Sequence, residues 1–372
     1  LMIRRPPRST LSSSSAASDV YKRQDAYFKV GSPPCLRIDD KIQEAEKERL
    51  KPADTEEVTK KLLTKEQFEQ FLNKKEFDCT YSIHGFGRFR LNAYFQRGTI
   101  GLVLRSIKMD IPSFAELNLP VETMKNLSSQ NNGLILVTGH AGSGKSTTLA
   151  AMIDYINNNF SKHIITIEDP IEFVHTDKKS IITQREVGTD TKDFHQALRH
   201  IVRQTPDVIL IGEMRDLETM QTAIMAAETG HLVLSTMHTI DAIGTIERIL
   251  NYFPPHVHGQ IRLQLSFLLK GVISLRLIPR ADTQGRVPAY EIMMPSATVR
   301  KCILENRIPR IAEAIEDGEI YGMNSFNQRF LKLVKEGIIN EETAVRNAGN
   351  PDELKLHIEN ILSGKQTHRK KE

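Results

Sequence analysis

The sequence predicts an α/β protein in which a smaller α/β domain precedes a nucleotide-binding domain built on a largely parallel sheet. Residues 139–146 read GHAGSGKS, a complete G-x-x-x-x-G-K-S phosphate-binding loop. An apolar run at 134–137 precedes the loop and a helix-like stretch at 147–156 follows it, which is the context that the motif requires. Further along, strand-like and helix-like stretches alternate as they do in parallel sheets. The 372 residues are enough for two ordinary domains.

The composition fits a globular enzyme and disfavours several other classes. Hydrophobic residues make up 40% of the chain and charged residues 26%, and the formal net charge is only +4. No basic block indicates nucleic acid as a partner, and no apolar stretch approaches the roughly 20 residues that span a bilayer. Cys35, Cys79 and Cys302 lie far apart without CxxC spacing. We therefore expect neither disulfides nor a zinc site, as suits a reducing cytoplasm.

The two ends of the chain are expected to lie outside the folded domains. Residues 1–24 are serine-rich and resemble translated sequencing-adapter read-through, so we expect a disordered leader that is not native. A targeting peptide is the competing interpretation, but the apolar core of a secretory signal is missing. Residues 365–372 form a basic tail that we expect to be solvated, with contact to an anionic membrane surface as the weaker alternative.

Residues 25–107 have the pattern of a small α/β domain with a truncated start. Its expected elements are strands at 26–30, 36–38 and 100–104, a helix over 55–73, and a hairpin over 81–94 with Gly85-Phe86-Gly87 as its turn. In the second strand of that hairpin an apolar residue stands at every second position, so Arg88 and Arg90 share the polar face. Prolines within 108–120 predict a linker before the second domain at 121–364.

The phosphate-binding loop assigns chemistry to individual residues. Its glycines let backbone N–H groups point at phosphate oxygens, and the N-terminus of the next helix adds partial positive charge. Lys145 is expected to reach the β- and γ-phosphates of ATP, and the Ser146 hydroxyl to lie on Mg²⁺. The residues of this loop expected to bind nucleotide are Gly139, Gly142, Ser143, Gly144, Lys145, Ser146 and Thr147. A chance glycine-rich turn is the alternative, which the flanking elements disfavour.

Three further strands are predicted at 164–167, 208–211 and 232–235, and polar residues follow each of them. The segments that follow are Glu168-Asp169-Pro170-Ile171-Glu172, Gly212-Glu213 and Thr236-Met237-His238-Thr239. Ligands of open α/β sheets bind beyond the carboxyl ends of the strands. We therefore expect these segments and the phosphate-binding loop to converge on one crevice.

The acidic residues are expected to handle metal and water. Many phosphate-loop ATPases have an aspartate where this chain has Gly212, so another carboxylate must help to organise Mg²⁺. Glu168, Asp169 and Glu172 are the predicted source, and Glu168 is also a candidate catalytic residue. Glu213 is predicted to orient and deprotonate the attacking water. Taken alone, the acidic triplet is better explained as a solvated turn with a helix cap; the nearby phosphate loop favours the metal site.

His238 follows a strand of buried type. We expect its ring to hydrogen-bond the γ-phosphate and so to report whether ATP or ADP is bound. A packing histidine with satisfied hydrogen bonds is the ordinary alternative. Two nearby aspartates, Asp207 and Asp216, are expected to be structural, either capping helices or pairing with Arg203 and Arg215.

Four sequence boxes carry a family resemblance. They are GHAGSGKS, ITIEDPIEFVH at 165–175, DVILIGEMRD at 207–216 and ETGHLVLSTMHT at 228–239. In this order and spacing they resemble the secretion-ATPase superfamily, and specifically the type IV pilus retraction ATPases, PilT and its paralogue PilU. The resemblance extends from about Asp25 to Ile361, and its second and fourth boxes are highly specific.

The resemblance implies an N-terminal PAS-like domain, a RecA-like ATPase domain and a homohexameric ring. ATP would lie between the two domains, with the neighbouring subunit completing each site. Arginines of the first domain would then contact nucleotide, at Arg88, Arg90 and Arg97, with Arg105 a further candidate. For Arg88 and Arg90 the alternative is the polar face of a half-exposed strand.

The same resemblance implies an ATP-hydrolysing motor of pilus retraction and twitching motility. Such a motor would act in the cytoplasm, at the inner face of the cell membrane, on a platform protein of the pilus. Extension-type and type II secretion ATPases usually carry a four-cysteine zinc insertion, which this sequence does not have, so the retraction branch is favoured.

Two alternatives stay open. The stretch TVRKCILENRI at 298–308 departs from the AIRNLIRE-like motif of the branch, and residues 276–293 are more similar to PilU. One alternative is therefore a nucleotide-binding accessory subunit that regulates another pilus motor, either beside it or in a mixed ring. The other is a related secretion or conjugation ATPase.

Overall fold

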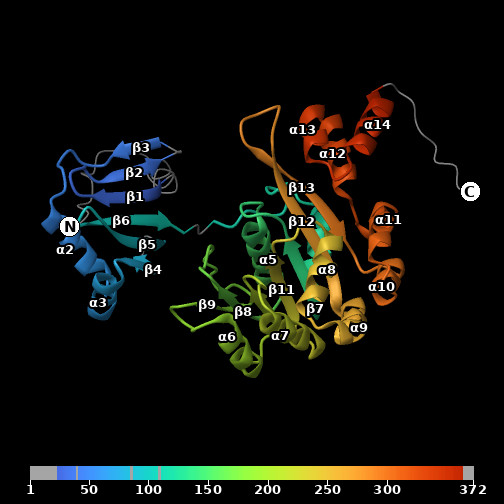
Figure 1. Cartoon of the computed structure of the whole chain (residues 1–372), viewed down its shortest axis with the longest axis horizontal. Coiled ribbons are helices and arrows are strands. Elements are labelled where there is room, and N and C mark those ends of the chain that lie inside the picture. Colours follow the sequence, from blue (N-terminus) through green and yellow to red (C-terminus); the bar gives the residue numbers. More distant parts are fainter. Residues whose placement is uncertain (1–22, 39–40, 84–86, 108–109, 363–372) are drawn as a thin grey trace, which may run out of the picture. The chain divides into compact units, whose positions relative to one another are not determined.

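The computed structural model describes residues 23–38, 41–83, 87–107 and 110–362. The chain divides into two compact units, one ending at Met109 and one starting at Asp110 (Figure 1). The basic tail, most of the expected leader, and residues 85 and 86 of the expected turn lie outside the described residues. The first strand begins at Arg23, inside the segment expected to be a leader, because its backbone pairs with Ile38.

The first unit is an antiparallel sheet with two helices. Its strands are β1 (Arg23–Lys29), β2 (Cys35–Ile38), β3 (Lys41–Glu44), β4 (Glu76–Ile83), β5 (Gly87–Gln96) and β6 (Thr99–Ser106). They follow the order β3-β2-β1-β6-β5-β4, and each adjacent pair is antiparallel. The helices are α2 (Pro52–Leu62) and α3 (Lys65–Lys74). Phe71 of α3 is buried in one cluster with Leu91 and Leu102 of the sheet.

Two elements of this unit differ from the sequence prediction. The apolar spacing predicts one helix over 55–73, whereas a capping box at Thr64 starts a second helix. The Thr64 hydroxyl accepts a hydrogen bond from the Gln67 backbone N–H (3.2 Å), and Gln67 Oε1 accepts one from the Thr64 N–H (3.0 Å). The strand β3 was not predicted, because all four of its residues are exposed and no apolar alternation marks it.

The second unit is built on a seven-stranded sheet. Its strands are β7 (Gly133–Thr138), β8 (His163–Glu168), β9 (Ile181–Glu186), β10 (Val208–Ile211), β11 (Leu232–Met237), β12 (Leu269–Pro279) and β13 (Arg286–Met293). The order is β13-β12-β7-β11-β10-β8-β9, and only the β12–β13 pair is antiparallel. The strands β7, β10 and β11 are buried along their whole length, which explains their continuous apolar runs.

Helices pack on this sheet, and five further helices, α10 to α14, follow its last strand along the chain. Together they are α4 (Val121–Ser128), α5 (Lys145–Asn159), α6 (Phe194–Ile201), α7 (Leu217–Glu228), α8 (Ala242–Tyr252), α9 (His258–Leu268), α10 (Ala297–Leu304), α11 (Ile311–Glu316), α12 (Phe326–Lys335), α13 (Glu341–Asn347) and α14 (Pro351–Leu362). A separate apolar cluster joins α12, α13 and α14 to the β12–β13 hairpin, through residues such as Phe330, Leu354 and Val287. Across the described parts of the chain, none of the helices has the length and apolarity of a membrane span.

The topology explains why the predicted site residues meet. The parallel strands β7, β11, β10 and β8 are consecutive neighbours, so their carboxyl ends share one edge of the sheet. The phosphate-binding loop follows β7, the acidic turn follows β8, Glu213 follows β10 and His238 follows β11.

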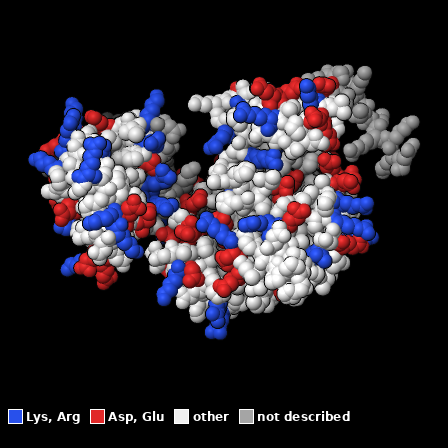
Figure 2. All heavy atoms as spheres, viewed as in Figure 1, with Lys and Arg blue, Asp and Glu red and all other residues white. Residues whose placement is uncertain are grey.

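On the face of the molecule seen in Figure 2, Lys and Arg residues are interspersed with Asp and Glu.

Candidate functional site

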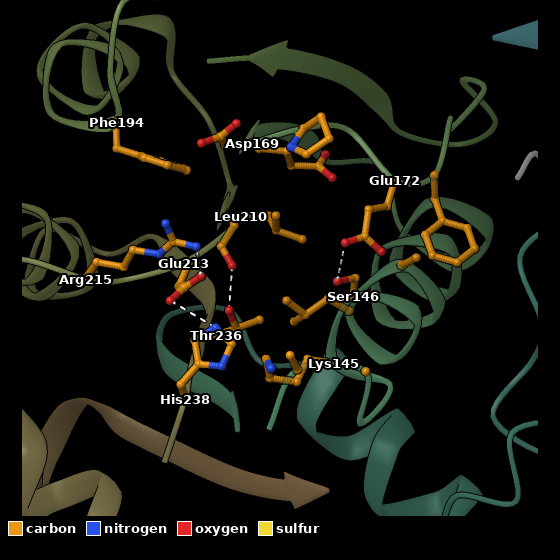
Figure 3. A pocket seen from close by; sticks show the side chains of 18 of the residues that line it. Lys145, Ser146, Asp169, Glu172, Phe194, Leu210, Glu213, Arg215, Thr236 and His238 are labelled. Atoms are coloured by element: carbon orange, nitrogen blue, oxygen red, sulfur yellow. Dashed lines mark hydrogen bonds and ion pairs between the residues drawn. The ribbon is translucent and has the colours of Figure 1, made fainter. Parts of the chain in front are cut away.

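A cavity of about 260 Å³ opens at the carboxyl edge of the second sheet. It brings together eight residues that the sequence singled out: Gly142, Lys145, Ser146, Glu168, Asp169, Glu172, Glu213 and His238. Side chains from the phosphate-binding loop, the acidic turn and the ends of β10 and β11 surround the same space (Figure 3). The convergence expected from the strand order is therefore present.

The Lys145 side chain is hydrogen-bonded to the backbone of its own phosphate-binding loop. Lys145 Nζ donates hydrogen bonds to the carbonyl oxygens of Gly139 (2.8 Å) and His140 (2.9 Å). Burial lowers the pKa of Lys145, although Glu213 and Glu172 oppose this by favouring its charged form. An ammonium group held by two carbonyl oxygens can exchange them for phosphate oxygens, which carry more negative charge.

Gly139 cannot be replaced without moving the backbone. Its φ is +139°, and a Cβ atom at this position would lie 2.4 Å from the carbonyl oxygen of Leu275 on β12. The loop therefore packs directly against the neighbouring strand.

The acidic turn presents its carboxylates in two different ways. Glu172 Oε1 accepts a hydrogen bond of 3.1 Å from the Ser146 hydroxyl (Figure 3). Glu168 Oε1 instead accepts hydrogen bonds from Thr166 Oγ1 (2.7 Å) and Gln184 Nε2 (3.2 Å). Burial raises the pKa of Glu168, and these hydrogen bonds oppose that shift. Asp169, followed by a cis peptide bond to Pro170, also lines the cavity.

Glu213 lies between Arg215 and the His238 ring at the end of β10. Its Oε2 is 2.7 Å from Arg215 Nη2, and its Oε1 is 3.2 Å from His238 Nε2 (Figure 3). Burial alone would raise the pKa of Glu213, but Arg215 and His238 together hold it below its ordinary value. The carboxylate is therefore ionised near neutral pH and has both oxygens engaged.

Gly212, where many phosphate-loop ATPases have an aspartate, has little room for a side chain. A Cβ atom there would lie 3.2 Å from the Ile167 carbonyl oxygen and 3.3 Å from the Glu168 Cα atom. Its own carbonyl oxygen accepts a 2.6 Å hydrogen bond from Thr236 Oγ1. β10 therefore approaches the end of β8 closely at Gly212, and a side chain there would press on the backbone of residues 167–168.

The structure leaves some predicted residues outside the cavity lining. Gly139, Ser143, Gly144 and Thr147 belong to the loop but do not line the cavity. The four arginines belong to the first unit. Arg88 and Arg90 lie on β5, Arg97 is in the β5–β6 turn with φ +49°, and Arg105 is on β6. Arg90 Nε is 3.8 Å from Asp78 Oδ1, and Arg105 Nε donates to Asp25 Oδ1 at 2.8 Å.

Several residues of the site were not found by sequence reasoning. Asp216 was expected either to cap a helix or to pair with Arg215, and Arg215 instead contacts Glu213. Asp216 is indeed a helix cap, because its Oδ1 accepts from the Thr219 N–H at the start of α7 (2.8 Å). His175 and Phe194 also line the cavity, as does Thr236, which belongs to one of the segments expected to converge there. The position of Arg215, two residues after Glu213, was the available signal for its role.

Residues 99–311 match the family model described as type II/IV secretion system protein. The chain belongs to this family. The type IV pilus ATPase PilU of Pseudomonas aeruginosa is 39% identical over 334 residues, which cover 90% of this chain and 87% of PilU. The type IV pilus retraction ATPase PilT of the same organism is 41% identical over 328 residues, covering 88% of this chain and 95% of PilT.

Solved structures agree with the secretion-family assignment. A crystal structure of the pilus retraction motor PilT with bound ADP has a TM-score of 0.84 at 43% identity, covering 94% of this chain and 100% of that chain. The Legionella pneumophila ATPase DotB has a TM-score of 0.74 at 25% identity, covering 95% and 94% of the two chains. The predicted resemblance and the predicted fold class, a smaller N-terminal α/β domain followed by an ATPase domain, are confirmed.

Proposed function

We propose that this chain hydrolyses ATP in the cavity at the carboxyl edge of its second sheet, and that this turnover powers retraction of a type IV pilus. The supporting observation is the cavity itself, where Lys145, the Ser146–Glu172 pair and the Glu213–His238 pair face one space. The homology to PilT and PilU over most of the chain supports the coupling to pili.

The residues of the cavity suit Mg²⁺ bound together with a nucleotide. A hydroxyl and carboxylates are the hard oxygen ligands that Mg²⁺ prefers. Within the described ranges, no three His, Cys, Asp or Glu residues are grouped closely enough to form a metal cage on their own. This fits an ion that takes one or two carboxylates and a hydroxyl from the protein and completes its shell with phosphates and water. Ser146, Glu172 and Asp169 would hold it, with Glu168 behind them, and when bound it neutralises developing phosphate charge.

Each of the other groups has one role in the proposed reaction. Lys145 binds the β- and γ-phosphates after leaving the carbonyl oxygens of Gly139 and His140. Glu213 orients the attacking water and accepts its proton. His238, which contacts Glu213, would link the γ-phosphate to that carboxylate, so loss of the phosphate changes the surroundings of Glu213.

We further propose that six copies form a ring in which arginines of the first unit, Arg88, Arg90, Arg97 and Arg105, reach nucleotide. Guanidinium groups near a transferring phosphoryl group stabilise its charge. Nucleotide-dependent opening of successive sites would then act on a platform protein of the pilus in the inner membrane. Peripheral contact of the ring with that membrane follows from the proposed partner.

The proposal is tested by steady-state hydrolysis with two replacements. Glu213→Ala should lower kcat by at least 100-fold while ADP affinity stays near that of the parent. Lys145→Ala should lower both turnover and nucleotide affinity, because its ammonium binds phosphate. Arg346→Ala, in the last turn of α13 and outside the cavity lining, serves as a control and should leave turnover unchanged. Retained hydrolysis in both site variants would remove the assignment.

An accessory role in a second motor is the alternative that the departing 298–308 stretch favours. The chain would then bind nucleotide and regulate a paralogous motor. Hydrolysis by the purified chain alone, compared with hydrolysis after addition of a paralogous motor, separates the two roles. Turnover that appears only with the partner supports the accessory role. Stimulation by DNA would instead favour a conjugation ATPase.

A further inference from the structure

The turn that carries the acidic residues is held by side chains of β9. This turn lies between β8 and β9, which are parallel neighbours. Gln184 stands opposite Thr166 in that pairing, and Glu186, two residues later, shares its face of the strand. Neither side chain lines the cavity.

The Gln184 side chain spans the turn from end to end. Its Nε2 donates hydrogen bonds to Glu168 Oε1 (3.2 Å) and to the Phe173 carbonyl oxygen (2.9 Å). Its Oε1 accepts from the His175 backbone N–H at 2.8 Å. One side chain thus fixes the first carboxylate of the turn relative to the backbone at its far end.

Glu186 adds a contact in the middle of the turn. It is buried, and its Oε2 accepts from the Ile171 backbone N–H at 3.3 Å. The segment between these contacts carries Asp169 and Glu172, whose side chains line the cavity. Glu172 reaches Ser146 from this held segment.

We propose that Gln184 is a positioning residue for the reaction, which sets where the Asp169 and Glu172 carboxylates lie relative to the phosphate-binding loop. The inference rests on the proposed ATP hydrolysis. Without the Gln184 amide, Glu168 loses one of its donors and the backbone at 173–175 loses two of its hydrogen bonds. The like charges of the turn then separate, because their spacing is no longer fixed. Residues of this kind behind a metal site typically account for 10- to 100-fold in activity or metal affinity.

Two replacements remove different parts of this arrangement. Gln184→Met has a similar length but makes none of the three hydrogen bonds. Gln184→Glu keeps the acceptor for the His175 N–H, loses both donations and places a second carboxylate beside Glu168. Thr183→Val is the matched control on the same strand. Its hydroxyl faces the other side, 3.4 Å from the His163 ring.

The experiment measures kcat, the KM for ATP, the thermal midpoint and the ADP dissociation constant with and without Mg²⁺, all on the full chain. Both Gln184 variants should lose about 10- to 100-fold in kcat, with the KM and the Mg²⁺-free ADP affinity within about twofold of the parent. Mg²⁺ should also strengthen ADP binding less in these variants than in the parent. Thr183→Val should match the parent in every quantity.

The failures of the two proposals can be told apart. If both Gln184 variants match the parent in kcat and in the Mg²⁺ effect, the residue is only structural and the inference is overturned, even if the thermal midpoint falls. If the parent itself does not hydrolyse ATP while the Mg²⁺ effect on ADP binding still shrinks in the variants, the proposed activity fails and the positioning role stands. If Gln184→Met does not fold, Gln184→Glu carries the same expectations.

Discussion

At the scale of single residues, the site depends on groups that already have partners within the protein. Lys145 is bound to two loop carbonyl oxygens, Glu172 to Ser146, and Glu213 to Arg215 and His238. For Glu172 and Glu213 such partners fix the rotamers before a ligand binds, which lowers the entropy cost of binding, whereas Lys145 would exchange its carbonyl partners for phosphate oxygens. Residue types and motif spacing were enough to find most of these groups. The pairs Ser146–Glu172 and Glu213–His238 were not predictable, because each joins segments that follow different strands and depends on the order of those strands in the sheet.

Gly139 gives the sharpest prediction at this scale. Gly139→Ala places a Cβ atom against the Leu275 carbonyl oxygen in a backbone conformation that alanine avoids, so loop and strand must separate. We expect ADP affinity to fall at least tenfold and the free energy of unfolding to fall by about 1–3 kcal/mol. Calorimetric titration with ADP and urea unfolding measure the two quantities.

The matched control is Gly349→Ala, where a Cβ atom meets nothing within 4 Å. It should change neither quantity measurably. Unchanged ADP affinity in Gly139→Ala would contradict the account of the loop.

At the scale of elements, the apolar strands that lead into the motifs were predictable, whereas the edge strands β9 and β3 were not. The runs at β7, β8, β10 and β11 are apolar because both faces of these strands are covered. In contrast, β9 and β3 lie at sheet edges and carry exposed residues, so no apolar run marks them. The missed strand β9 is also the one that holds the acidic turn. Because β9 was not predicted, the contacts of Gln184 and Glu186 with the acidic turn were not predicted either.

The first residue of α8, four residues after His238, donates its backbone N–H to a buried carboxyl group. Glu291 on β13 accepts from the Ala242 N–H with its Oε1 at 2.9 Å. Burial raises the pKa of Glu291 to about 7; Asp241 and Glu316 add to the shift, and the Ala242 N–H and Arg276 oppose it. Its folded pKa lies above its ordinary value of 4.5, so the protonated form favours folding.

The sign of the resulting pH dependence follows from linkage. The contribution of Glu291 to stability is fully present below about pH 4.5 and is lost as pH rises through about 7. Glu291→Gln keeps an acceptor oxygen and cannot ionise. Relative to this variant, the parent should therefore lose on the order of 2–3 kcal/mol of unfolding free energy between pH 5 and pH 8. Urea unfolding at several pH values measures it; a constant difference between the two proteins would contradict the expectation.

The capping box at Thr64 tests the break between α2 and α3. Thr64→Ala removes the side-chain acceptor for the Gln67 N–H and should lower the stability of the first unit by about 1 kcal/mol. Hydrogen exchange of the α3 amides should accelerate, while amides of β7 and β11 in the second unit keep their protection. Unchanged exchange in α3 would show that the cap does not stabilise the helix.

At the scale of the whole molecule, the family and the fold class were predictable because four motif boxes stand in a fixed order. The roles of Arg88, Arg90, Arg97 and Arg105 were not derivable in the same way. They depend on how one unit meets another, and a residue pattern along one strand does not encode that arrangement.

The proposed ring makes a prediction about mass. In the presence of ADP and Mg²⁺, light scattering on the full chain should give the mass of six copies of the 42.2 kDa polypeptide. If Arg105 acts on nucleotide rather than on assembly, Arg105→Ala should lower turnover and still give the mass of six copies. A monomer that hydrolyses ATP at the full rate would contradict the ring.

The most direct test is an experimental structure of the full chain with a non-hydrolysable ATP analogue and Mg²⁺. The account predicts the triphosphate in the cavity, with Lys145 Nζ moved from the carbonyl oxygens of Gly139 and His140 to phosphate oxygens at about 2.7–2.9 Å. It also predicts the Ser146 hydroxyl on the metal ion and Glu213 facing the γ-phosphate. Nucleotide bound elsewhere, or Lys145 still held by the loop carbonyls beside a bound triphosphate, would contradict it.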